Sequence, residues 1–315
     1  MSCFLGLDTS NYTTSAAIYD DVKGEVFTHR RLLDVEQGSI GLRQSGAVFI
    51  HTQRISEVML DLYKDSGSVP LMACSASEKP REVDGSYMPC FLVGASHAKV
   101  IALSLDIPYF AFSHQQGHLA AGAWSAKRLD LLDAPFIALH VSGGTTEMLY
   151  VSPSDNGLFT AIRTGGTTDL AAGQLIDRCG RKLGLDFPSG PALEKLALER
   201  TSEQYFVPKQ CGLDFSISGL ENKANELMKN GESASNVAYF VIKSITEVLS
   251  NAIESSLTVY NNVPILCVGG VMSNSIIRHE IEKRFNAIFA KPEFATDNAA
   301  GIALLACRAY RNGVD

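Results

Sequence analysis

The sequence predicts an α/β protein of two lobes, built from one unit of strands and helices that occurs twice. Two observations predict this fold class. Each half of the 315-residue chain opens with a three-stranded meander and continues in helices that alternate with short apolar strands. Each half also places a short turn of small and polar residues between its first two strands. Two units of about equal length with the same order of elements indicate an internal duplication.

The first half contains seven predicted elements. Short apolar runs bounded by polar turns predict its strands, and apolar residues near helical spacing, such as Val48, Ile55 and Val58, predict its first helix. In chain order the elements are strands at 3–7, 14–20 and 25–31, a helix at 47–65, a strand at 70–74, a helix at 90–105 and a strand at 108–112.

The second half repeats this order and then extends it. Its elements are strands at 135–141, 147–152 and 158–163, helices at 169–183, 190–200 and 233–258, a strand at 264–268, a helix at 274–286, a strand at 287–290 and a helix at 296–310. We therefore expect the lobes to be residues 1–130 and 131–315, with the polar stretch 125–133 as the hinge.

Three turns of small residues predict a nucleotide site. The turns at 8–11 and 142–146 can present backbone N–H groups and hydroxyls to an anion, and Gly269 and Gly270 would let the backbone approach an adenosine closely. Two phosphate-binding hairpins that face each other are the architecture of actin and sugar kinases. The predicted fold is therefore an actin-like (ASKHA) duplicated ribonuclease-H-like fold around a nucleotide cleft. The alternative is two ordinary hairpins and one glycine turn.

Two histidines four residues apart form a candidate metal site. On a helix, this spacing places the imidazoles of His114 and His118 on one face, close enough to share a metal ion, although such a pair can also be a half-exposed packing feature. A zinc protease of the HExxH type needs a glutamate directly after the first histidine as its base. Gln115 stands there and cannot take up a proton, so hydrolysis of this type is disfavoured.

Composition excludes several classes of protein. A hydrophobic content of 46% excludes a disordered chain, and no apolar run reaches the roughly 18 residues of a membrane helix. The N-terminus does not resemble a secretory signal. The seven cysteines include no closely spaced pair, which indicates a reducing, cytoplasmic location. The 27 basic and 34 acidic side chains give a net charge of −7, which at first argues against a nucleic-acid partner.

Nearly the whole chain resembles the tRNA threonylcarbamoyladenosine synthase family, long labelled O-sialoglycoprotein endopeptidase. Each matching segment is common by itself, but seven in the same order are specific for the superfamily and favour this branch. They are LGLDTS at 5–10, HQQGH at 114–118, VSGG at 141–144, DLAAGQLIDRCGRKLGLDFPSGP at 169–191, GLDFSISGL at 212–220, GGVMSN at 269–274 and PEFATDNAAGIA at 292–303.

The resemblance implies a ligand set and a substrate. It implies that Fe2+ or Zn2+ is held by His114, His118 and Asp297, a set that leaves coordination positions open for substrate oxygens. Asp8, which could hold a water or a cation at the phosphates, and Thr145 are the candidate catalytic residues. Threonylcarbamoyl-AMP, or ATP or ADP, is expected to bind along Val141, Ser142, Gly143, Gly144, Asp177, Gly190 and Asn274.

The chain also departs from the family pattern. The first hairpin of the family carries Cys-Asp-Glu-Thr where this chain has Asn11, Tyr12, Thr13 and Thr14, so two carboxylates are absent. Thr145 replaces a histidine, Gln116 replaces a glutamate, and residues 75–91 replace a glycine-rich stretch. The pattern suggests a divergent paralogue that has kept its metal and nucleotide ligands.

The leading function is therefore transfer of a threonylcarbamoyl group from its adenylate to the exocyclic amine of a tRNA adenosine. The alternatives are a catalytically reduced paralogue that binds nucleotide and metal and scaffolds a partner, and a kinase or ATPase. Expected partners are tRNA and proteins of the same modification pathway, with a related actin-like subunit as one candidate and no membrane. A charge of −7 still permits tRNA, because only a local basic patch or a partner must meet phosphate. Arg178, Arg181 and Lys182 could form such a patch or a solvated helix face.

Overall fold

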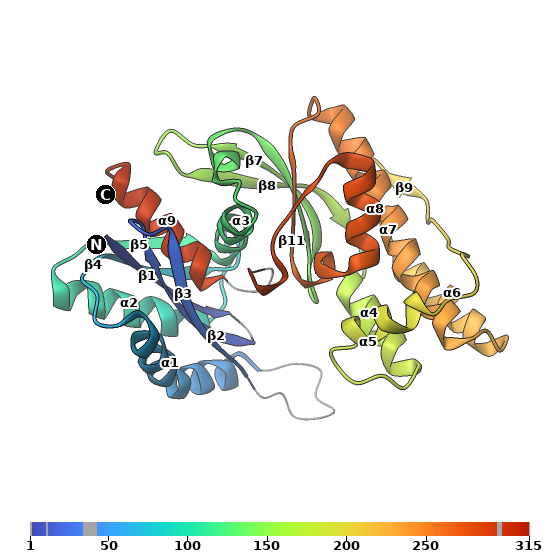
Figure 1. The fold of residues 1–315 in the computed structure, drawn as a ribbon, viewed down its shortest axis with the longest axis horizontal. Coiled ribbons are helices and arrows are strands. Elements are labelled where there is room, and N and C mark those ends of the chain that lie inside the picture. Colours follow the sequence, from blue (N-terminus) through green and yellow to red (C-terminus); the bar gives the residue numbers. More distant parts are fainter. Residues whose placement is uncertain (1, 11, 34–42, 295–297, 315) are drawn as a thin grey trace. The chain divides into compact units, whose positions relative to one another are not determined.

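The computed structural model describes residues 2–10, 12–33, 43–294 and 298–314. The chain divides into two compact units (Figure 1). Unit 1 consists of Met1–Asp133, Pro153–Thr160 and Thr296–Asp315, and unit 2 consists of Ala134–Ser152 and Ala161–Ala295. None of the helices in the described ranges is long and apolar enough to cross a membrane.

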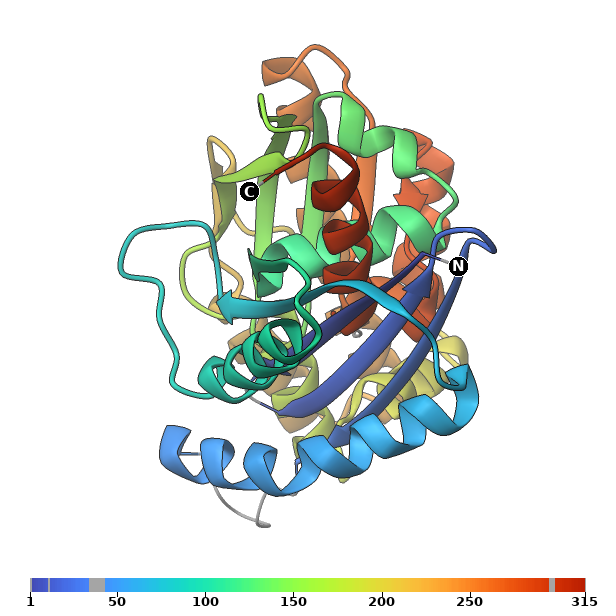
Figure 2. The ribbon, with the colours of Figure 1, turned by 90° about the vertical axis from the view of Figure 1, so that its left-hand side faces the viewer.

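Unit 1 is built on a five-stranded sheet with the strand order β3-β2-β1-β4-β5 (Figures 1 and 2). The first three strands are antiparallel, and β4 and β5 continue the sheet in parallel with β1. The strands are β1 (Cys3–Ser10), β2 (Thr13–Asp20), β3 (Glu25–Leu32), β4 (Leu71–Lys79) and β5 (Tyr109–Ser113). The helices are α1 (Gln44–Ser66), α2 (Phe91–Leu105), α3 (His114–Ser125), η1 (Leu129–Asp133) and α9 (Ala299–Arg311).

Alternation along β1 assigns its side chains to the two faces of this sheet. Leu5 and Leu7 are fully buried in a core with Ile55 of α1 and Val93 of α2. Gly6 points to the other face, where a Cβ would lie 2.4 Å from the backbone oxygen of Ala299 in α9. The sheet is therefore covered on both faces, and the cover on one of them is the C-terminal helix.

Unit 2 is built on a seven-stranded sheet with the order β12-β11-β6-β7-β8-β10-β9. Its core lies between this sheet and the helices, and the long helix α7 supplies many of the buried apolar side chains. The strands are β6 (Phe136–Val141), β7 (Thr146–Pro153), β8 (Phe159–Thr167), β9 (Gln210–Cys211), β10 (Asp214–Phe215), β11 (Ile265–Val268) and β12 (Ile288–Phe289). The helices are α4 (Ala172–Lys182), α5 (Gly190–Leu198), α6 (Ser218–Lys229), α7 (Ala234–Val259), η2 (Gly270–Ser273), α8 (Ser275–Phe285) and η3 (Pro292–Phe294).

The two sheets confirm the predicted duplication. In each, a three-stranded meander is followed by a strand that pairs in parallel with the first strand of the meander, namely β4 beside β1 and β11 beside β6. The predicted division at residue 130 is close to the first boundary between the units. The structure differs at the other end of the chain, because α9 packs against β1 and α3 and so belongs to unit 1 rather than to a C-terminal lobe.

Candidate functional site

The two predicted metal-binding histidines lie at the start of α3 in unit 1. A capping box fixes this start: the Gln116 N–H donates to Ser113 Oγ (3.2 Å), and the Ser113 N–H donates to Gln116 Oε1 (2.9 Å). His114 is therefore the first helical residue and His118 lies one turn later. Their rings meet edge to face with centroids 4.7 Å apart, so the spacing does place both imidazoles on one face.

Asp8, at the end of β1, holds His114 in place. It is 1% exposed, and its Oδ2 lies 2.8 Å from His114 Nδ1 and 2.5 Å from Ser77 Oγ. Burial alone would raise the pKa of Asp8, but His114 and the hydrogen bonds from His114, Ser77 and the Ser10 N–H outweigh burial and lower it. An ionised carboxylate only accepts, so Nδ1 of His114 donates, and in the neutral imidazole Nε2 then carries the lone pair. A lone pair on Nε2 is what a metal ligand requires.

The residue that directly precedes α9 also contacts His114. Asn298 is 3% exposed, and its Nδ2 lies 3.3 Å from His114 Nε2. Its Oδ1 has no hydrogen-bond partner within the described part of the chain. The predicted third ligand, Asp297, lies outside the described residues, as does Asn11 of the first hairpin.

The donor set fits a transition metal as far as the structure describes it. Two imidazoles share one face, and a carboxylate orients the first of them, which is the usual support of a metal-bound histidine. Within the described residues no group of three or more His, Cys, Asp or Glu could hold a metal ion. A three-ligand site therefore depends on Asp297.

The predicted nucleotide residues lie in unit 2, where two glycine turns meet. Val141 ends β6, and a Cβ on Gly269 (φ 99°) would lie 2.3 Å from the Val141 backbone oxygen. At Gly143 and Gly144 a Cβ would meet nothing within 4 Å, so the turn has free space on its outer side. Ser142 N–H donates to the Thr145 backbone oxygen (2.8 Å), and this bond closes the turn.

The N-terminus of α4 packs against the same turn. A Cβ on Gly173 would lie 2.5 Å from Gly143 Cα, and the Ala172 N–H donates to Thr146 Oγ1 (2.8 Å). The turn thus lies at the N-terminal end of a helix, where N–H groups and the helix dipole favour an anion.

The other three predicted residues lie in the same part of unit 2. Asp177 Oδ1 accepts from the Ser189 N–H (2.8 Å), next to Gly190 at the start of α5, and burial raises the pKa of Asp177 despite this bond. Asn274 caps α8, with its Oδ1 accepting from the N–H groups of Ile276 and Ile277. The N–H of Ser275 donates to Glu194 of α5 (2.8 Å), which joins these two helix starts.

Sequence reasoning missed three contributions to the histidine site. Ser77 contacts Asp8 from β4, and no motif marks it. Asn298 lies within the matched segment 292–303, but nothing in that segment indicates that it contacts His114 from the start of α9. Gln116 appeared only as a departure from a family pattern, but its Nε2 donates to the Phe159 backbone oxygen (3.2 Å) while its Oε1 caps α3. The face of β1 on which Asp8 lies could be predicted from the sequence. Side chains alternate along a strand, so Asp8 lies on the same face of β1 as Gly6.

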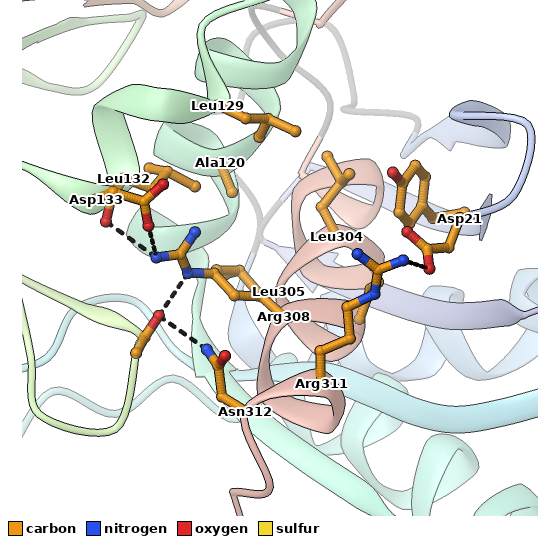
Figure 3. A pocket seen from close by; sticks show the side chains of 13 residues that line it. Asp21, Ala120, Leu129, Leu132, Asp133, Leu304, Leu305, Arg308, Arg311 and Asn312 are labelled. Carbon is orange, nitrogen blue, oxygen red and sulfur yellow. Dashed lines mark hydrogen bonds and ion pairs between the residues drawn. The ribbon is translucent and has the colours of Figure 1, made fainter.

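A cavity of about 370 Å³ also lies in unit 1, along α9 (Figure 3). Leu129, Leu132, Leu304 and Leu305 supply its apolar lining. Its two arginines are already paired: Arg308 contacts Asp133 and the Gly157 backbone oxygen, and Arg311 contacts Asp21 (Figure 3). None of the predicted site residues lines this cavity, so we place the candidate site at the histidines and the glycine turns.

Comparison with known proteins gives a family match and several matches of fold. The model of the TsaD family, tRNA N6-adenosine threonylcarbamoyltransferase, matches residues 51–304. The structure is similar to component A of (R)-2-hydroxyglutaryl-CoA dehydratase from Acidaminococcus fermentans, with a TM-score of 0.57, 15% identity, and coverage of 99% of this chain and 100% of that one.

Two further structures are similar over most of this chain. The activator of 2-hydroxyisocaproyl-CoA dehydratase from Clostridium difficile, with bound ADPNP, gives a TM-score of 0.52 at 15% identity and covers 99% of this chain and 96% of that one. HypF from T. kodakarensis gives a TM-score of 0.63 at 14% identity and covers 99% of this chain and 48% of that one. At these identities the likeness shows the fold alone, which is the actin-like α/β fold that the sequence predicts.

Proposed function

The chain belongs to the TsaD family of tRNA N6-adenosine threonylcarbamoyltransferases, and from this membership we propose that it is a metal-dependent enzyme that moves a threonylcarbamoyl group from threonylcarbamoyl-AMP to the exocyclic amine of a tRNA adenosine. The observation that carries the metal-dependent part is the contact between Asp8 and Nδ1 of His114, which orients the His114 ring edge to face with the ring of His118.

His114, His118 and Asp297 would hold one Fe2+ or Zn2+ ion. When bound, the ion would supply positive charge for the oxygens of the threonylcarbamoyl group. Asp8 keeps the proton of His114 on Nδ1, and Ser77 and the Ser10 N–H keep the Asp8 carboxylate oriented. These residues therefore position a ligand, and we assign them no proton transfer to or from the substrate.

The adenylate, or ATP or ADP, would bind along the two glycine turns of unit 2. The open turn from Val141 to Gly144 at the N-terminal end of α4 would receive the phosphate or the mixed anhydride. Asp177 keeps one carboxylate oxygen for ribose hydroxyls after Oδ1 has accepted the Ser189 N–H, and Asn274 keeps its Nδ2 after Oδ1 has capped α8. Gly190 would let the backbone approach the ligand. Thr145 directly follows Gly144 in the chain, and its hydroxyl would face the reacting group.

A second candidate function is a catalytically reduced paralogue that binds nucleotide and metal and scaffolds a partner. Tyr12 and Thr13 favour it, because they stand where the family carries two carboxylates, and Tyr12 is 43% exposed at the first hairpin. In either case we propose tRNA and proteins of the same pathway as partners, including a related actin-like subunit as a candidate. A cytoplasmic location agrees with the free state of all seven cysteines, six of them buried.

The test measures metal content and transfer separately. The full chain is purified, its iron and zinc are quantified, and transfer to tRNA is followed with threonylcarbamoyl-AMP and the expected partner proteins. We expect one metal ion per chain, loss of metal and transfer in His114→Ala, and metal affinity lowered about 10- to 100-fold in Asp8→Asn. Asp20→Asn is the matched control, because Asp20 is a buried carboxylate at the opposite end of the β1–β2 pair.

The outcomes separate the two functions. Transfer by the wild-type chain that is lost in His114→Ala excludes the reduced paralogue. Metal and nucleotide binding without transfer supports the reduced paralogue. A chain without stoichiometric metal that leaves tRNA unmodified in the presence of its partners overturns the proposed enzyme.

A further inference from the structure

The loop that joins α4 to α5 is tightly anchored. The Leu185 N–H donates to the Gly180 backbone oxygen (2.9 Å), Ser189 Oγ donates to the Asp186 backbone oxygen (3.0 Å), and the Ser189 N–H donates to Asp177. Gly180 lies so close to this loop that a Cβ there would be 2.3 Å from Ser189 Cβ. Both ends of the loop are thus fixed against α4 by short-range contacts.

Phe187 projects from this anchored loop into solvent. Its side chain is 73% exposed. In the described segment from α4 to the middle of α5, no other large apolar side chain is exposed. An isolated aromatic ring on a fixed loop is too small for a protein-docking patch. It is the right size to stack on a single planar group.

The exposed stripe of α4 that leads to this loop is basic. Gln174, Arg178, Arg181 and Lys182 are exposed at positions that share one face of the helix. Arg178 and Lys182 share a single carboxylate, that of Glu221 on α6, at 3.2 and 2.7 Å. With Asp177 on the same face of α4 and Asp186 in the loop counted as well, three cations face three carboxylates. Arg181 is the cation of this stripe for which the described residues hold no carboxylate partner, so it is the one most available to a phosphate.

We propose that the basic stripe of α4 and Phe187 form an RNA-contact surface, in which Phe187 stacks on an unpaired base and the cations contact phosphates. The proposal rests on the proposed function, which makes tRNA the substrate. Fixed aromatic rings next to cations are the usual means of binding single-stranded RNA, and loops of structured RNA offer unstacked bases. The anchored loop runs directly from the α4 stripe to Gly190, so the RNA would bind next to the candidate adenylate residues.

The test measures RNA affinity of the full chain by fluorescence anisotropy, with a labelled tRNA anticodon stem-loop over a series of salt concentrations. Phe187→Ala is expected to weaken binding on the order of 5- to 150-fold, the range for loss of one stacked base, while Phe187→Tyr keeps the ring and the affinity. Arg181→Gln is expected to lower the slope of log K against log salt by about 0.7 to 0.9. Phe49→Ala on α1 and Lys229→Gln on α6 are the controls, since both side chains are exposed outside this surface.

The proposal is overturned if the wild-type chain does not bind the stem-loop, or if Phe187→Ala and Arg181→Gln bind it like the controls. A Phe187→Ala chain that binds RNA normally but loses a pathway protein in pull-down assigns the surface to a protein partner and also overturns it. Metal content and transfer of the wild-type chain are measured in parallel. If these are present while the RNA results fail, the proposed function stands without this surface.

Discussion

Gln116 in unit 1 departs from the family pattern, and its hydrogen bonds suit the amide that this chain carries. Gln116 is 7% exposed and uses both ends of its amide: Oε1 accepts from the Ser113 N–H, and Nε2 donates to the Phe159 backbone oxygen. A glutamate at this position could make the first bond but not the second, because a carboxylate does not donate. The amide therefore fits this chain better than the family's glutamate.

Gln116→Glu is expected to lower the free energy of unfolding by about 1–3 kcal/mol, because a buried carboxylate oxygen would face the Phe159 carbonyl without a proton between them. Urea denaturation of the full chain measures the change. Gln53→Glu makes the same chemical change on the exposed surface of α1, where an effect within about 0.5 kcal/mol is expected. Equal effects at the two positions would contradict the role of the bond to Phe159.

The sequence predicted that two histidines share a face of a helix, but it did not predict the contacts around them. The spacing of His114 and His118 predicted a shared face, and the structure has one. The partner of His114 could not be predicted, because Asp8 lies 106 residues away and only the folded chain brings the two side chains together. Asn298 lies within the matched segment 292–303, but only the packing of α9 reveals its contact with His114.

Among the elements, α3 and α9 pack closely enough to require glycine. A Cβ on Gly301 of α9 would lie 1.8 Å from the Gly117 backbone oxygen and 2.9 Å from the Ala121 nitrogen of α3. Gly301→Ala must push the helices apart, and we expect the free energy of unfolding to fall by about 1–3 kcal/mol. Metal affinity is expected to fall with it, since His114 is on one helix and Asn298 precedes the other.

Gly46→Ala in α1 is the matched control for this prediction, because a Cβ at Gly46 would meet nothing within 4 Å. In a helix with free space, alanine is expected to stabilise by about 0.4–1 kcal/mol. Urea denaturation and metal titration of both variants make the comparison. A Gly301→Ala chain as stable as Gly46→Ala would show that the two helices can separate freely.

Asp169, just before α4, joins that helix to the start of α6. Burial would raise its pKa, but hydrogen bonds from Ser216, from the Ser218 and Ile217 N–H groups and from the Leu170 N–H hold the pKa well below its usual range. A carboxyl whose pKa is lower in the folded state stabilises the fold above its unfolded pKa of about 3.9. This stabilisation is lost as the pH falls below that value toward the folded pKa.

Urea denaturation at pH 7 and at pH 3.5 tests the contribution of Asp169. The wild-type chain is expected to lose more unfolding free energy between these pH values than Asp169→Asn, which has no proton to take up at this position. Parallel losses in the two chains would show that other carboxyls account for the acid sensitivity.

Prediction of elements from the sequence succeeded where periodicity was strong and failed where elements were short. The meanders and the long helix near 233–258 follow their apolar patterns. The two-residue strands β9 and β10 are too short to show alternation, and α6 has only Leu220 and Ala224 buried, so its pattern is weak. The predicted helix at 169–183 begins three residues later, because the side chain and backbone of Asp169 and Leu170 hold the turn before it.

At the scale of the whole molecule, unit 1 is assembled from three separate segments of the chain. The face of its sheet that carries Phe4 and Gly6 is covered by α9, and the ring of Phe4 lies 5.7 Å from that of Tyr310. The lobes predicted from duplication alone could not include this feature, because the repeat describes the order of elements and not the partner of the last helix.

A fragment of residues 1–133 is therefore expected not to unfold cooperatively, since it would expose an apolar sheet face to water. Fusing residues 298–314 to it through a flexible linker is expected to restore a cooperative transition, measured by thermal circular dichroism and by the dispersion of amide NMR signals. A cooperative transition in the shorter fragment would show that α9 is dispensable for the core of unit 1.

The place of α9 also has a consequence for the order in which the protein is made. The ribosome synthesises all of unit 2 before residues 298–314 emerge, so the first sheet must wait with one face uncovered while the second sheet folds. His114 and His118 are translated early, but Asn298 can join them only at the end. Products of interrupted synthesis would thus carry the histidines without Asn298 beside His114, and would present their uncovered sheet to chaperones and proteases instead.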